Sequence, residues 1–186
     1  MSDSVIRLKI ELDDTDPPIW RTIEIPGAIS LKDLHRIVQA AMGWEDEHLF
    51  AFQVGREEVA SRVRLADLAA RRIKRFGYLY DMGDNWQHTL RIEEVMSADP
   101  EVAYPRLVGG AGRCPPEDCG GIPGFYAFLE VIADPQHPDY EDRLEWYGDV
   151  FDFAEMDVAQ INQRLAHRRS SQAEGGQAQI MTRRAR

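Results

Sequence analysis

The chain has 186 residues, 44% of them hydrophobic, and a formal net charge of -10 at pH 7. This length and composition predict a folded protein with one substantial core. They exclude a membrane-spanning protein, because no run approaches the roughly 18 apolar residues that cross a bilayer, and the negative charge excludes a protein that coats nucleic acid over its whole surface.

The beginning of the chain and its cysteines indicate a compartment. Met1–Ser4 lack the basic and apolar regions of a signal peptide. The chain has two cysteines, spaced as Cys-x4-Cys, which are too few for a disulfide framework and are typical of two thiols in a reducing environment. We therefore expect a cytoplasmic protein with no membrane partner.

The N-terminal third predicts two strands and a helix. Apolar and polar residues alternate over residues 5–12 and again over residues 19–25, with turn residues between them, which predicts an antiparallel hairpin. Ser30 can cap a helix that ends at Gly43. The apolar face of that helix consists of Leu31, Leu34, Ile37, Val38, Ala41 and Met42.

The middle of the chain predicts further strands and a short helix. Strands are expected over residues 49–54, 76–80 and 89–95, and a helix over residues 65–70. Residues 81–85 carry the Gly, Asn and Asp of a tight hairpin turn. The order of elements predicts an α+β fold: a mixed or antiparallel sheet with a helix packed across it, similar to the β-grasp arrangement in its N-terminal part.

The last third predicts a long loop followed by helices. Pro and Gly recur from Met96 to Pro123 and argue against a continuous helix or strand there. C-terminal helices are expected over residues 125–132, 138–147 and 158–165. We predict a single domain over residues 1–169 and a disordered tail over residues 170–186, which lacks apolar residues to bury.

Two polar segments are the candidate site. The predicted hairpin turn and the loop Cys114–Gly121 are rich in carboxylates, thiols and glycines, which seldom fill a core. Both border apolar segments and need hydrogen-bond partners, so we predict that they pack against each other. The ligand-binding candidates are Asp81, Asp84, Trp86, His88, Glu117 and Asp118.

A metal site is the sharpest chemical hypothesis for these segments. Cys114, Cys119 and His88 offer zinc ligands, with Asp81 or Asp84 as the fourth. Two prolines separate the only two thiols, which favours buried, unliganded thiols and a His88 that hydrogen-bonds the turn. No cofactor is therefore expected, with zinc or another divalent ion as the alternative.

The carboxylates of the two segments allow a second interpretation. If the segments converge, their carboxylates would form an oxygen-rich pocket for Mg²⁺ or Ca²⁺, or an acid and base pair. The competing interpretation is that these side chains cap their own turns. The carboxylates concerned are those of Asp81, Asp84, Glu117 and Asp118.

Other polar residues receive structural or surface interpretations. His35, beside the apolar helix face, and His48, at a strand start, are expected to be structural. The segment Arg56–Arg75 has seven Lys or Arg against three acids and is either a solvated face or an edge that binds a protein or nucleic acid. That basic edge comprises Arg62, Arg64, Arg71, Arg72, Lys74 and Arg75.

Five ordered motifs resemble the plasmid pRiA4b ORF-3-like family, also labelled passenger TnpR-like proteins of mobile elements. The resemblance covers roughly residues 5–166 and implies an α+β domain of bacteria, archaea and their plasmids, with no established activity. The motifs are Pro17-Pro18-Ile19-Trp20-Arg21, residues 34–44, His48-Leu49, Tyr80-Asp81-x-Gly83-Asp84-x-Trp86-x-His88 and Cys114–Gly121.

At three positions of the hairpin, this chain has a residue that differs from the one common in the family. Met82 stands where Phe is common, Asn85 where Gly is common and Gln87 where Glu is common. The change at Gln87 removes a carboxylate, so a cation held there would be bound more weakly.

Two functions follow from the sequence. The favoured one is a non-enzymatic binding or adaptor domain associated with plasmids and mobile elements. The alternative is a metal-dependent hydrolase or nuclease that uses Asp81, Asp84, His88, Glu117 and Asp118. No phosphate-binding loop, nucleophile elbow or His-Glu-x-x-His motif supports another enzyme class.

Overall fold

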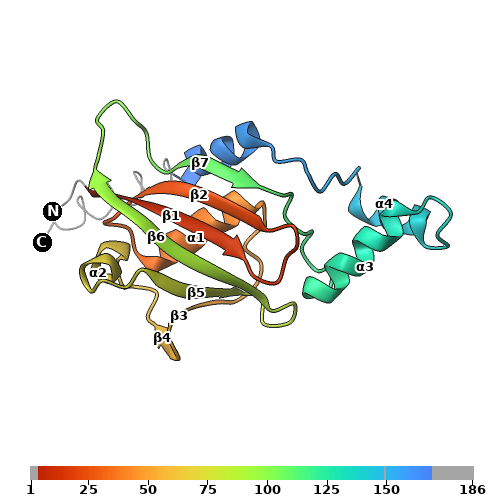
Figure 1. The fold of residues 1–186 in the computed structure, drawn as a ribbon, viewed down its shortest axis with the longest axis horizontal. Coiled ribbons are helices and arrows are strands. Elements are labelled where there is room, and N and C mark those ends of the chain that lie inside the picture. The colour runs from red at the N-terminus through yellow and green to blue at the C-terminus, as the bar shows by residue number, and fades with distance from the viewer. Residues whose placement is uncertain (1–3, 149, 169–186) are drawn as a thin grey trace, which may run out of the picture.

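The computed structural model describes residues 4–148 and 150–168 (Figure 1). Seven strands form one sheet in the order β4-β3-β5-β6-β1-β2-β7, and the described pairings are all antiparallel. The elements are β1 Ser4–Leu12, β2 Ile19–Pro26, α1 Leu31–Met42, β3 Phe50–Val54, β4 Glu57–Val59, α2 Leu65–Ala70, β5 Arg75–Tyr80, β6 Trp86–Ser97, β7 Arg106–Ala111, α3 Gly121–Ala133, α4 Tyr140–Tyr147 and a last helix over residues 158–168.

The predicted α+β class is confirmed, with an antiparallel sheet. β1 pairs with β2 from Val5↔Pro26 to Leu12↔Ile19 and with β6 on its other side. Because side chains alternate along a strand, β1 turns Ile6, Leu8 and Ile10 to the core and its polar residues to the other face. Strand β1, in the interior of the sheet, therefore carries the apolar core face that the alternation predicted.

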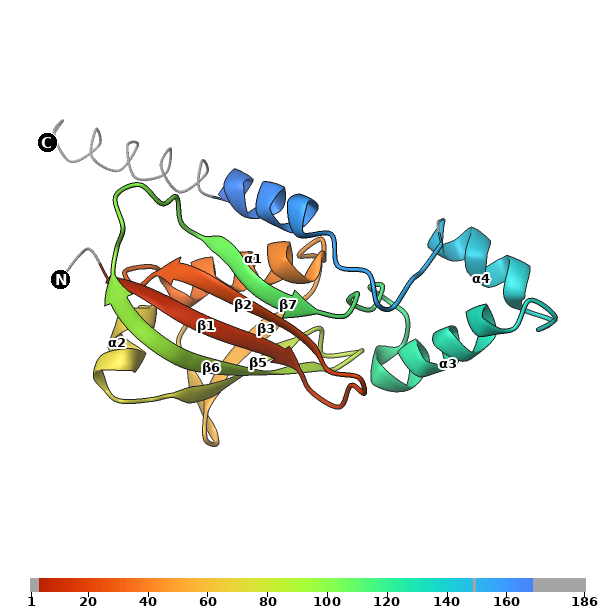
Figure 2. The same cartoon turned by 45° about the horizontal axis from the view of Figure 1, so that its top comes forward.

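Helix α1 lies across the core face of the sheet (Figures 1 and 2). Ser30 Oγ accepts a hydrogen bond from the Asp33 backbone N–H at 3.1 Å, and Gly43 ends the helix in the left-handed region at φ 94°. In the part of the chain that the structure describes, no helix covers the opposite face of the sheet. That face, called the open face below, is accessible to solvent.

The predicted loop over residues 96–123 is wrong in two places. Residues 106–111 form β7, which pairs with β2. A Cβ on Gly110 would lie 2.6 Å from Met156 Sδ and 2.8 Å from the Trp20 carbonyl oxygen, so the strand needs a glycine at this close approach. Helix α3 begins at Gly121 and contains Pro123, whose missing N–H is not needed in a first helical turn. The short edge strand β4 was also not predicted.

A second apolar cluster joins α3 and α4, which extend beyond one end of the sheet (Figure 1). Phe128 packs edge-on against Phe151 at a ring-centroid distance of 5.3 Å, and Tyr147 lies 5.4 Å from the same ring. Among the described helices, none has the length and apolar character needed to cross a membrane. The predicted tail over residues 170–186 lies outside the described residues.

Candidate functional site

The five sequence motifs meet at one end of the sheet, where three connections come together. These are the β5–β6 turn, the segment after α1 and the loop between β7 and α3. The Gly120 backbone N–H donates to Asp84 Oδ2 at 3.1 Å. A Cβ on Gly121, which has φ +68°, would lie 2.3 Å from the Asp84 carbonyl oxygen, so only glycine permits this approach. The predicted packing of turn against loop is confirmed.

Glu117 attaches the loop to two neighbouring elements. Its carboxylate accepts a hydrogen bond from the Tyr80 hydroxyl at 2.5 Å and from the Glu45 backbone N–H at 2.6 Å. Burial, and then the bond to Glu117, raise the pKa of Tyr80 above its usual range, so this hydroxyl stays a donor. Trp44 Nε1 donates to the Pro115 carbonyl at 2.9 Å. These bonds hold the loop against β5 and the end of α1.

One cluster of metal-ligating groups forms among the described residues, and it contains a histidine that sequence reasoning missed. His48 Nε2 lies 3.1 Å from Asp118 Oδ1 and 3.7 Å from Asp81 Oδ2. One ligand atom from each residue lies within 4.8 Å of the others. The sequence favours a structural interpretation of His48, although its motif position beside Leu49 is a signal for a site residue.

The predicted carboxylates also accept hydrogen bonds within the turn and between the loop and its neighbours. Asp81 Oδ1 accepts the Gly83 N–H at 2.8 Å, as expected of a turn-capping aspartate. Asp84 is committed to Gly120, and Glu117 to Tyr80 and Glu45. Of the four predicted carboxylates, Asp81 and Asp118 therefore share a site with His48.

The structure does not bring the three proposed zinc ligands, Cys114, Cys119 and His88, together. The group of possible metal ligands among the described residues is His48, Asp81 and Asp118 instead. Cys114 Sγ lies 3.2 Å from Arg21 Nη2 and 3.6 Å from Met42 Sδ. Cys119 instead lies near the Gly121 carbonyl, at the start of α3. Burial raises the pKa of both thiols, that of Cys119 to about 12, so both are protonated. The rigid loop separates the two cysteines.

Trp86 and His88 belong to the core instead of a ligand pocket. Trp86 is fully buried, and its ring centroid lies 5.7 Å from that of Trp44. His88 Nδ1 lies 3.1 Å from the Trp86 carbonyl oxygen, and His88 Nε2 has no hydrogen-bond partner among the described residues. Both side chains point to the α1 side of β6 because the period-2 alternation places them among buried neighbours.

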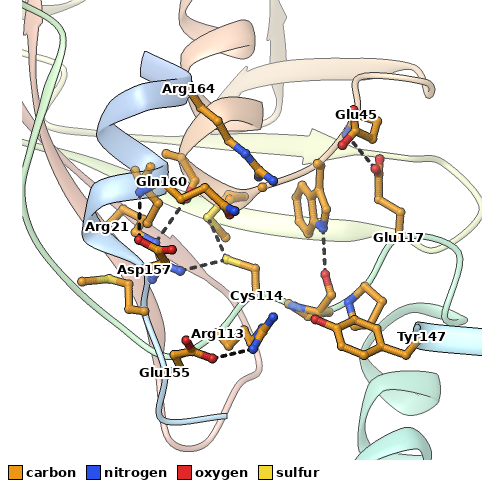
Figure 3. A pocket seen from close by; sticks show the side chains of 18 residues that line it. Arg21, Glu45, Arg113, Cys114, Glu117, Tyr147, Glu155, Asp157, Gln160 and Arg164 are labelled. Carbon is orange, nitrogen blue, oxygen red and sulfur yellow. Dashed lines mark hydrogen bonds and ion pairs between the residues drawn. The ribbon is translucent and has the colours of Figure 1, made fainter. Parts of the chain in front are cut away.

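A cleft of about 460 Å³ lies beside the cluster (Figure 3). Its walls come from the start of β2, the end of α1, the Arg113–Glu117 segment and the helix over residues 158–168. A cleft of this size is typical of small-molecule sites. Its charged lining residues are Arg21, Glu45, Arg113, Glu117, Glu155, Asp157 and Arg164.

Arg21 forms the floor of the cleft. Its side chain is 2% exposed, and it faces the core because it shares the inner face of β2 with Ile19 and Ile23. Its guanidinium donates to four carbonyl oxygens, those of Trp20, Ala41, Ala111 and Gly112, at 2.8 to 3.2 Å. Arg21 therefore ties β2 to α1 and to the end of β7.

Two charged side chains in the cleft, those of Arg164 and Glu45, have no ion-pair partner among the described residues, whereas the others form ion pairs, hydrogen bonds or a helix cap. Arg113 pairs with Glu155 at 2.6 Å, and Asp157 caps the last helix by accepting the Gln160 N–H at 2.8 Å. Arg164 has no carboxylate within ion-pair distance among the described residues, and its guanidinium points into the cleft (Figure 3). The exposed carboxylate of Glu45 lies at the rim.

Comparisons with known proteins agree with the fold. A family model described as plasmid pRiA4b ORF-3-like protein matches residues 4–160. The uncharacterized protein y4hQ of Sinorhizobium fredii is 38% identical over 180 residues, which cover 89% of this chain and 92% of that protein. A crystal structure of the protein of unknown function MM3350 from Methanosarcina mazei Go1 is similar with a TM-score of 0.80 and 34% identity, and covers 86% of this chain and 98% of that one.

Proposed function

The chain belongs to the plasmid pRiA4b ORF-3-like family, and we propose that this member is a non-enzymatic binding or adaptor domain whose cleft receives a ligand with an anionic group. An association with plasmids and mobile elements is part of the proposal and rests on the family description alone. The chemical class of the ligand is inferred from the side chains that line the cleft.

The observation that carries the proposal is the uncommitted guanidinium of Arg164. Guanidinium groups bind carboxylates and phosphates through two parallel hydrogen bonds. Arg164 comes from the last helix and lines the cleft together with Pro115 and Pro116, so a ligand that fills the cleft would contact both walls. The carboxylate of Glu45 would repel a second anionic group at the rim, which favours a ligand with one anionic end.

We expect the change Arg164→Gln to abolish ligand-dependent stabilisation. At least one of two probes, acetate or inorganic phosphate, should raise the melting temperature of the wild-type protein, because a ligand that binds only the folded state stabilises it. The variant should melt as the wild type does without a probe and should not respond to it. Differential scanning calorimetry with increasing probe concentration measures both.

The matched control is Arg36→Gln. Arg36 is a half-exposed arginine on α1, paired with Asp33 at 3.2 Å and absent from the cleft. This control should keep the wild-type response. An equal response from Arg164→Gln, or no response of the wild-type protein to any probe, would contradict the proposal.

A second candidate function, a metal-dependent hydrolase or nuclease, is favoured by the cluster of His48, Asp81 and Asp118. One imidazole and two carboxylates suit Zn²⁺ or Mn²⁺. Asp118 is exposed, so water or substrate would have access to the remaining coordination positions. A bound metal would lower the pKa of a coordinated water and supply a nucleophile. This ligand set uses His48 in place of the predicted His88.

We expect His48→Ala to weaken binding of Zn²⁺ or Mn²⁺ by at least roughly tenfold, because a three-ligand site tolerates little loss. Isothermal titration of the purified protein with each metal salt measures the effect, and His137→Ala, outside the cluster, is the control. If the metal also supports hydrolysis of bis(p-nitrophenyl) phosphate, Asp118→Asn should abolish it. Unchanged metal affinity in His48→Ala would exclude this site.

A further inference from the structure

Three cations lie side by side on the open face of the sheet. Arg75 of β5 pairs with Arg91 of β6, and Arg91 pairs with Lys9 of β1. Residues directly opposite each other in antiparallel strands point to the same face. Each of the three alternates with buried core residues, so the row faces away from α1.

Two members of this row, Arg75 and Arg91, have no counter-charge in the part of the chain that the structure describes. Among the described residues, no carboxylate lies within ion-pair distance of Arg75 or Arg91, and the Arg75 guanidinium donates a hydrogen bond to Thr89 Oγ1 at 3.1 Å. Lys9 is partly neutralised by Glu11 at 2.5 Å. Like charges directly opposite each other destabilise a sheet, so this row lowers the stability of the fold. A contribution to stability therefore does not explain why these three cations lie together.

The remaining arginines of the same face are arranged differently. Arg7 and Arg106 both pair with Glu24, at 2.8 and 2.7 Å, and Arg7 also pairs with Glu94. The sheet therefore neutralises its cations near β2 and β7. Uncompensated positive charge is confined to the β5–β6 part of the face.

A hollow of about 340 Å³ lies beside the row. It opens over Gly77, the strand residue between Gln53 and Thr89, because a glycine adds no side chain to the face. Polar side chains that can donate hydrogen bonds surround it, and one carboxylate, that of Asp13, lines it as well. The side chains at the hollow are Asp13, Gln53, Arg75, Leu79, Gln87 and Thr89.

An aromatic ring lies next to the row. Trp20 of β2 is partly exposed on the open face, and the Lys9 ammonium lies 5.0 Å from its ring centroid. Proteins that bind single-stranded nucleic acids combine cations that follow the backbone with aromatic side chains that stack on bases. The open face presents both kinds of group.

We propose that the open face binds the phosphodiester backbone of a single-stranded nucleic acid along the row Arg75, Arg91 and Lys9. Strands are spaced about 4.8 Å apart, so the row is about 10 Å long, which exceeds one phosphate group. The predicted basic edge continues from Arg75 toward Lys74 and Arg72. Elsewhere the net negative charge repels phosphates, which confines the contact to this face.

The test is the salt dependence of binding to a fluorescently labelled oligo(dT) of about 20 nucleotides, long enough for one binding site. For single strands the slope of log K against log salt is about -0.7 for each neutralised phosphate, so the two free arginines predict a slope of about -1.4 or steeper. Arg75→Gln and Arg91→Gln should each reduce the slope by about 0.7, and the double variant should not bind.

Two controls separate this proposal from the cleft. Arg36→Gln on α1 and Arg164→Gln in the cleft should both bind the oligonucleotide as the wild type does. The double variant should melt at or above the wild-type temperature, because it removes a like-charge contact. Undiminished binding by the double variant would overturn the proposal. Stabilisation by inorganic phosphate that persists in Arg164→Gln and is lost in the double variant, without oligonucleotide binding, would also overturn it, because it would assign the hollow to a small ligand.

Discussion

Replacing Arg21 with Met is expected to destabilise the protein by about 3 to 5 kcal/mol, because several buried carbonyl oxygens would lose the donor that satisfies them. The side chain is 2% exposed, and four carbonyl oxygens accept its hydrogen bonds. Methionine fills a similar volume but donates nothing, so buried carbonyls would lose their charged donor. Each such loss costs about 1 to 3 kcal/mol.

Urea unfolding followed by tryptophan fluorescence measures this effect, and Arg21→Lys keeps the test informative if the methionine variant fails to fold. Lysine retains the charge but has three donors on one atom, so it cannot reach all four carbonyls, and it should fall between wild type and Arg21→Met. Arg36→Met should change the free energy of unfolding by less than about 0.5 kcal/mol. If Arg21→Met lowers the free energy of unfolding by less than about 1 kcal/mol, Arg21 does not hold β2, α1 and β7 together.

Acid should destabilise the protein through His88. Burial lowers the pKa of His88 from its ordinary value of 6.5 to about 4, because the imidazolium would lose its hydration. The unfolded chain therefore binds a proton that the folded chain excludes. Stability from this group is complete above pH 6.5 and is lost as the pH falls toward 4, by about 3 kcal/mol in total.

Comparison of free energies of unfolding at pH 7 and pH 4.5 isolates this contribution. His88→Gln removes the titrating group, so its stability should fall between those pH values by about 2 to 3 kcal/mol less than that of the wild type. Leu90→Val, a buried change on the same strand, should be less stable than wild type but keep its pH dependence. An equal pH dependence in His88→Gln would refute the assignment.

Local sequence patterns predicted most of the elements that hold the site. The alternation of β1 and β2, the Ser30 cap of α1 and the turn residues after Tyr80 each act within a few residues, so they are visible without the fold. The mutual need of two polar segments for hydrogen bonds also predicted the contact between Asp84 and the cysteine loop.

Long-range pairing decided what local patterns could not. The glycines of β7 read as a loop because their strand conformation depends on hydrogen bonds to β2, more than 80 residues away in the chain. His48, Asp81 and Asp118 come from three separate connections, so no spacing in the sequence joins them. The same holds for Arg75, Arg91 and Lys9, which share a row only because of the register of β1, β5 and β6.

The sequence by itself therefore determined the type of most elements, the α+β class and the segments rich in chemistry. The tertiary structure alone decided which of those side chains are buried and which meet. His88 and Trp86 were predicted as ligand contacts and lie in the core, whereas His48 and Arg164 face solvent-accessible sites. The physical reason is that periodicity shows which face of an element is apolar, whereas the neighbours of that face depend on strand register and on how connections pack at the end of the sheet.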